Sequence, residues 1–103
     1  MFNFNNPYNN YSSNNMENNS MPINFDTLQK ARQDLIGEIQ AVIEYDAHIH
    51  NTNDRIAKET WKNIKNEELT HIGELLALLN YLDPSQKQFV QKGVMEFTES
   101  LKQ

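Results

Sequence analysis

Apolar residues follow two long helical stripes in the middle of the chain. Positions spaced alternately by three and four residues share one face of an α-helix, so such stripes predict amphipathic helices. The first stripe comprises Ala31, Leu35, Glu38, Val42, Tyr45 and Ile49. The second comprises Ala57, Trp61, Ile64, Glu68, His71 or Ile72, Leu75, Leu79 and Leu82.

Cap and turn residues set the ends of these two helices. Asp26 is expected to cap the first helix, with Gln29 three residues on as a capping box requires, and the helix runs to about His50. Residues 50–54 then break the pattern with cap-forming side chains. Because this break is short, the second helix, over about 54–82, is expected to fold back antiparallel to the first.

A third helix begins at Asp83, which is the expected N-cap, with Pro84 at the first helical position and Gln86 at the third. It ends near Leu101. One of its faces carries Gln86, Val90, Val94, Phe97 and Leu101. No strand-like alternation is present, so the sequence predicts an all-α fold: an antiparallel two-helix hairpin with a short C-terminal helix.

The first 22 residues differ in composition from the rest. Nine of them are Asn, which disfavours helices and strands and favours turns. We therefore expect a disordered Asn-rich tail over 1–22 and a helical domain over 23–103. The tail either has no role or acts as a short targeting or cargo segment.

Composition narrows the chemistry. The chain has no cysteine, which excludes disulfides, thiolate metal sites and iron–sulfur clusters, so any metal must bind through carboxylate and imidazole. A net charge of −5 argues against nucleic acid as a partner. The sequence has no run of 18 apolar residues and no basic, apolar N-terminal segment, so we expect neither a membrane span nor a signal peptide, and a cytoplasmic location.

Carboxylates interrupt both stripes near their middle. Glu38 lies in the centre of the first stripe and Glu68 in the centre of the second, with His71 one turn further on at the edge. A buried carboxylate costs several kcal/mol unless something pairs with it. The nearby cations, Lys62 and Lys65, fall on other faces of the helix.

A bound divalent metal would meet this cost. Residues at i and i+3 project to the same side of a helix, so Glu68 and His71 can hold one ion together. The alternative is a polar network of Glu38, Glu68, His71 and Tyr45 that fixes the helix register without metal.

The number of ligands indicates an interface. Ferritin-like di-iron bundles use one Glu from each of two helices and a Glu-x-x-His from each of the other two. This chain offers one helix of each kind, which is half of the set. Two chains would supply the complete four-helix bundle, so we expect a homodimer that shares both its core and its site.

These residues resemble the encapsulated ferritins, short ferritin-like proteins that lie inside encapsulin shells. The matching segments are Glu38-Ile39-Gln40-Ala41, with Tyr45-Asp46 seven residues after Glu38, and Glu67-Glu68-Leu69-Thr70-His71. The interval of 30 residues from Glu38 to Glu68 is also the family's. The resemblance covers roughly residues 28–82.

The resemblance implies a ferroxidase in which two iron ions per dimer are oxidised from Fe(II) to Fe(III) by dioxygen. It assigns Glu38, Glu68 and His71 as metal ligands and Tyr45 as a residue that supports them. It further implies a ring-like decamer and a place inside an encapsulin nanocompartment, whose shell stores the mineral.

The chain departs from the family at several places. Gly37 and Gln40 stand where family members tend to carry extra carboxylates, Glu44 replaces an aromatic residue, and the C-terminus, FTESLKQ, does not look like a shell-docking tail. Two other functions therefore stay open: a manganese or iron protein that scavenges peroxide or oxygen, and a non-enzymatic helical assembly or coat protein.

Overall fold

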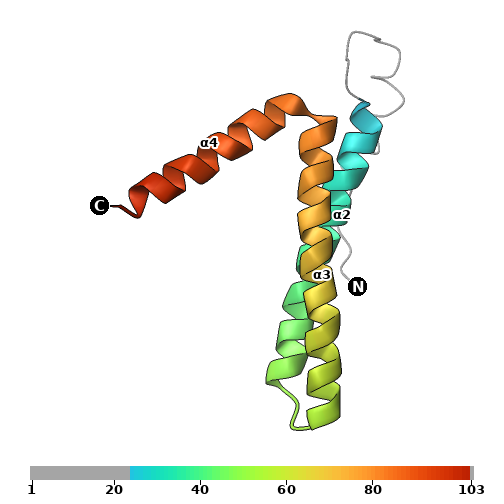
Figure 1. Ribbon diagram of the computed structural model, residues 1–103. Helices are drawn as coiled ribbons and strands as arrows, with labels where there is room; N and C mark the ends of the chain where they lie inside the picture. Colours follow the sequence, from blue (N-terminus) through green and yellow to red (C-terminus); the bar gives the residue numbers. More distant parts are fainter. Residues whose placement is uncertain (1–23, 103) are drawn as a thin grey trace.

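The computed structural model describes residues 24–102, in which all regular structure is helical. Helices α2 (Phe25–His50) and α3 (Arg55–Leu82) lie side by side as an antiparallel hairpin, and α4 (Pro84–Ser100) projects away from its end (Figure 1). The predicted all-α class and the order of helices are confirmed for these residues. The tail expected over 1–22 lies outside them.

Helix capping agrees with the sequence prediction at α3 but not at α2. Asp54 caps α3 by accepting a hydrogen bond at 2.8 Å from the backbone N–H three residues on. The prediction that Asp26 caps α2 is wrong. Asn24 precedes the first helical residue, and its Oδ1 accepts from the Thr27 N–H at 3.0 Å. Asp26 lies inside the first turn, where it pairs with Lys30 at 2.9 Å.

The junction between α3 and α4 is one residue long and is held by several contacts. Asp83 Oδ1 accepts from the Ser85 and Gln86 N–H groups at 3.1 and 3.2 Å, so the predicted cap of α4 is confirmed. Arg32 of α2 donates to Gln86 Oε1 through Nη2 at 2.6 Å and through Nε at 3.2 Å. Its Nη2 also lies 3.7 Å from Asp83 Oδ2. These contacts tie the first turn of α4 to α2.

Both predicted stripes face the neighbouring helix of the hairpin. Every residue of the two stripes is buried or half-buried, and Ile72 rather than His71 occupies the shared position on α3. This confirms the helical periodicity that the sequence predicts. Among residues 24–102, no helix is both long and apolar enough to cross a membrane.

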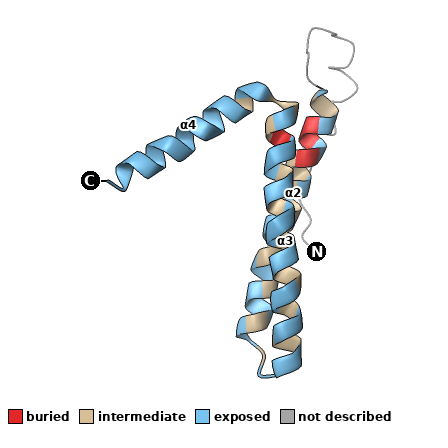
Figure 2. Ribbon diagram, viewed as in Figure 1, coloured by how far each residue is buried: buried red, intermediate tan, exposed pale blue. Residues whose placement is uncertain are grey.

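The core is confined to one end of the hairpin, where α2 begins and α3 ends (Figure 2). Leu28, Ala31 and Leu79 are buried there, and Leu35 and Leu82 pack against them. The rest of the hairpin has no fully buried apolar side chain among the described residues. A chain this short buries a limited share of its apolar surface.

Candidate metal centre

The hairpin brings the three predicted ligands together at its middle. Glu38 comes from α2, and Glu68 and His71 come from α3, which runs past it in the opposite direction. One ligand atom from each residue lies within 4.8 Å of the other two. His71 Nδ1 is 3.4 Å from Glu68 Oε1 and 3.6 Å from Glu38 Oε2. Residues 30 positions apart in the sequence thus form one cluster of ligand atoms.

The cluster leaves one carboxylate oxygen without a hydrogen bond. Oε2 of Glu38 is buried and accepts none from the described residues, because His71 Nδ1 at 3.6 Å is beyond hydrogen-bond distance. A buried acceptor with no partner costs free energy, and such groups are rare in folded proteins. A cation beside Glu38 would remove this cost, so the cluster fits a metal ion.

The pKa of Glu68 is affected by the neighbouring Glu38 carboxyl group. A hydrogen bond with the Glu38 carboxyl group raises the pKa of Glu68 above its ordinary value of 4.5, and burial and the charge of Glu38 raise it further. His71 acts in the opposite direction. Glu68 therefore keeps its proton to a higher pH than an isolated carboxyl group does. A divalent ion would displace that proton and neutralise both groups.

The exposure of the cluster is uneven. The side chains of Glu38 and Glu68 are 25 % and 20 % exposed, whereas that of His71 is 47 % exposed. The cluster therefore opens on the side of the hairpin where His71 lies. Two carboxylates and one imidazole suit iron, manganese and zinc, and three ligands leave coordination positions for a second chain or a small molecule.

Neighbouring cations do not neutralise the cluster. Lys65 Nζ pairs with Asp46 Oδ1 at 2.9 Å, across the hairpin, and Lys62 lies 4.0 Å from Glu59. The prediction that both lysines lie on other faces is confirmed. Neither lysine therefore neutralises the carboxylates of Glu38 and Glu68.

Sequence reasoning did not predict the ring contacts between the ligand cluster and the turn at residues 51–54. The Tyr45 ring meets His48 edge-on, with centroids 6.2 Å apart, and His48 lies 5.0 Å from the ring of Trp61. His48 follows Glu44 by four residues, but Glu44 accepts from Gln40 at 3.2 Å. A role for Tyr45 toward His71 of another chain stays a prediction.

Comparisons with protein-family models, with curated proteins and with solved structures gave no match. The functional argument for this chain therefore rests on the geometry of the Glu38, Glu68 and His71 cluster and on the sequence resemblance described above.

Proposed function

We propose that the protein is a ferroxidase whose di-iron site forms between two copies of the chain. The observation that carries this proposal is the cluster itself: two carboxylates and an imidazole from both helices of a hairpin, within 4.8 Å of one another. The unsatisfied oxygen of Glu38 supports it, because a cation bound beside that atom would give it a partner.

The need for two copies follows from the ligands and from the core. One chain supplies half of the ligands of a ferritin-like di-iron bundle. Only three of its apolar side chains are buried among the described residues, all at one end of the hairpin. A second hairpin placed against the side that exposes His71 would complete the site and cover the half-buried stripes, which gives a ferritin-like four-helix bundle.

Each ligand has a distinct role in this proposal. Glu38 binds one iron ion, and Glu68 bridges both ions because a carboxylate has two oxygens to share. His71 adds a nitrogen to each ion's set. The hydroxyl of Tyr45 donates to or accepts from His71 of the partner chain and fixes the orientation of the imidazole.

Iron is the substrate of this reaction. The two Fe(II) ions of a dimer would together give two electrons to one dioxygen molecule, which would take up two protons and leave as hydrogen peroxide, while both ions leave as Fe(III). The open coordination positions would admit the oxidant. The product would feed iron storage or detoxification. By resemblance, the proposed assembly is a ring-like decamer in an encapsulin nanocompartment within the cytoplasm.

Oxidation of Fe(II) in air tests the proposal. The wild-type protein should oxidise Fe(II) much faster than buffer does, whereas Glu68→Ala and His71→Ala should fall close to the background rate. Glu67→Ala is the matched control, since Glu67 is an exposed neighbour of the same type outside the cluster. If the cluster variants keep the wild-type rate, the proposed function is wrong.

Two other functions have support in the same cluster. Carboxylate and imidazole ligands suit manganese as well as iron, which favours a peroxide- or oxygen-scavenging protein. The hydrogen bond between the Glu38 and Glu68 carboxyl groups also favours a metal-free network in a helical assembly or coat protein. Binding of Mn(II) together with rapid loss of peroxide would favour the scavenging protein. Failure to bind either iron or manganese would favour the assembly or coat protein.

A further inference from the structure

The hairpin has a second face, on the side away from His71, where five large aliphatic side chains lie among a few charged ones. On α3, Leu69 and His71 are two residues apart, so their side chains point roughly 200° apart around the helix. On α2, Ile36 and Glu38 have the same relation. We call this surface the aliphatic face; its large side chains are Ile36, Ile39, Ile43, Leu69 and Leu76.

An ion pair confirms that both helices contribute to the aliphatic face. Asp46 follows Ile43 by three residues and so lies on the same side of α2, and Lys65 precedes Leu69 by four residues on α3. The two charged groups meet at 2.9 Å. The five aliphatic side chains are between 43 % and 56 % exposed, which is unusual for a contiguous set of isoleucines and leucines.

A second apolar surface of the same chain is also uncovered. The apolar stripe of α4, formed by Val90, Val94, Phe97 and Leu101, is between 41 % and 68 % exposed. No residue of α4 is buried. Most of the stability of a helix in a protein comes from packing of its apolar face, so α4, of 17 residues, needs a surface to pack on.

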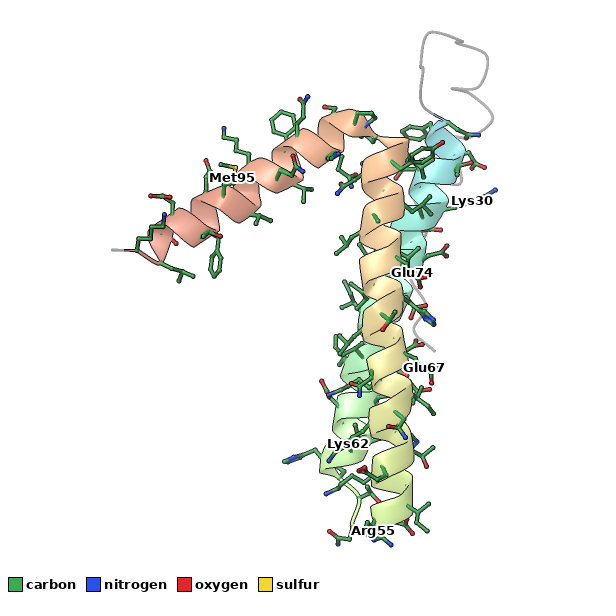
Figure 3. All side chains as sticks on the ribbon, in the orientation of Figure 1. Lys30, Arg55, Lys62, Glu67, Glu74 and Met95 are labelled. Atoms are coloured by element: carbon green, nitrogen blue, oxygen red, sulfur yellow. The ribbon has the colours of Figure 1, made fainter. Side chains whose placement is uncertain are left out.

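The contacts at the junction keep α4 away from its own hairpin. Asp83 is the only residue between α3 and α4, and its carboxylate caps α4. Arg32, which shares a side of α2 with Ile36 and Ile39, holds Gln86 in the first turn. From there α4 points outward, and Figure 3 shows its labelled residue Met95 far from the hairpin, on the side of Lys62 rather than of Glu67 and Glu74.

We propose that α4 of one copy packs on the aliphatic face of a second copy, and that the second copy's α4 packs reciprocally on the first. Each chain then covers both of its apolar surfaces with the same kind of contact. A fully exposed aliphatic or aromatic side chain presents on the order of 150–200 Å². Nine of them at about half exposure offer on the order of 800 Å² per copy, the share that each partner brings to a stable interface of standard size.

This contact is separate from the one that completes the metal site, since the two lie on opposite sides of the hairpin. A chain with two different two-fold contacts assembles into a closed ring or an open filament of dimers. The proposal goes beyond the ferroxidase proposal and does not depend on metal binding, so either can fail without the other.

Single introduced cysteines test the contact directly, because the chain has none of its own. A mixture of Val94→Cys and Ile39→Cys proteins should form a disulfide-linked heterodimer under mild oxidation. Lys92→Cys is the matched control on the opposite side of α4, and it should give little product with Ile39→Cys. If linkage forms mainly in Val94→Cys alone, α4 pairs with α4; if it forms mainly in Ile39→Cys alone, hairpins pair. Either result, or no linkage at all, overturns the proposal.

Particle mass in solution gives an independent test. Val94→Asp should reduce the wild-type particle to a dimer that still oxidises Fe(II), because the metal-site contact is untouched. Glu68→Ala should instead lose oxidation and keep the contact through α4. An unchanged mass for Val94→Asp contradicts the proposal. A fall to single chains would show that the two contacts are not separate interfaces.

Discussion

The two helices of the hairpin form an apolar core at the end where α2 begins and α3 ends, here called the core end, and a cluster of polar ligand atoms at the middle. At the core end, Leu28, Ala31 and Leu79 exclude water, and the adjoining junction is fixed by Arg32. At the middle, the same stripes carry carboxylates, and one oxygen of Glu38 is buried without a hydrogen bond. The core end is formed by one chain, whereas we propose that a second chain completes the middle.

This difference shows how a short chain can fold and still keep a site incomplete. Apolar contacts at one end hold α2 and α3 in register, so the ligand residues come together without contributing to the core themselves. Polar groups that are only partly satisfied are costly, and proteins keep them where a ligand or partner completes them. Substitutions in the core at the end and in the ligand cluster at the middle should therefore change stability in opposite directions.

The largest expected change in stability is in the apolar core, where α2 begins and α3 ends. Leu79→Ala should lower the free energy of unfolding by about 3 kcal/mol, because Leu79 is buried and the substitution leaves a cavity. Leu78→Ala is the matched control, since Leu78 is 40 % exposed, and it should cost less than about 1 kcal/mol. Urea unfolding in the presence of chelator measures both. Equal losses would contradict the burial of Leu79 in a core that leaves Leu78 exposed.

A smaller change in the free energy of unfolding, of opposite sign, is expected for Glu38→Gln at the middle of the hairpin. Without metal, the pKa of Glu68 is raised in the folded chain, so below pH 4.5 Glu68 is protonated in both states and carries no penalty. As the pH rises from 4.5 through the raised pKa, the unfolded chain releases its proton first, and the folded state loses stability. Glu38→Gln removes the partner carboxyl and should reduce this fall.

Unfolding of the metal-free protein across this pH range measures the effect. Glu67→Gln, on the exposed side of α3, should leave the pH dependence unchanged. A Glu38→Gln protein that loses stability as steeply as the wild type would contradict the carboxyl pair.

The smallest expected effect concerns a glycine that neither region uses. A Cβ added at Gly73 would meet nothing within 4 Å, so no close approach within the chain requires this glycine. Gly73→Ala should raise the free energy of unfolding by about 0.5–1 kcal/mol and leave Fe(II) oxidation unchanged. A loss of stability in the assembled protein, but not in dilute single chains, would indicate that a partner approaches at Gly73.

Helical periodicity predicted the two stripes and the ligands at the middle, but it did not predict that the core is confined to one end or that Leu28 belongs to it. The stripes, the break at residues 50–54 and the Asp83-Pro84 boundary depend on local rules, and the structure agrees with each. Juxtaposition of Glu38 with Glu68 followed from the antiparallel hairpin. The error at Asp26 arose because two cap-forming residues, Asn24 and Asp26, lie close together, and either satisfies the local pattern.

Other features depend on contacts between distant residues, which periodicity does not reveal. The clamp from Arg32 to Gln86 joins side chains 54 residues apart. The isoleucines of the aliphatic face are spaced as a second helical stripe, but their exposure becomes clear only once α2 and α3 are paired. Likewise, the sequence predicted the apolar stripe of α4, but it did not predict that α4 points away from the hairpin.

The most direct test of the account is the metal content of each assembly state. Native mass measurement after anaerobic addition of Fe(II) should find two ions on each dimer and none retained by single chains, because one chain supplies half of the ligands. His71→Ala dimers should retain neither ion. Tight binding of iron by a single chain, or dimers that hold iron equally well without His71, would contradict a site completed by a second copy.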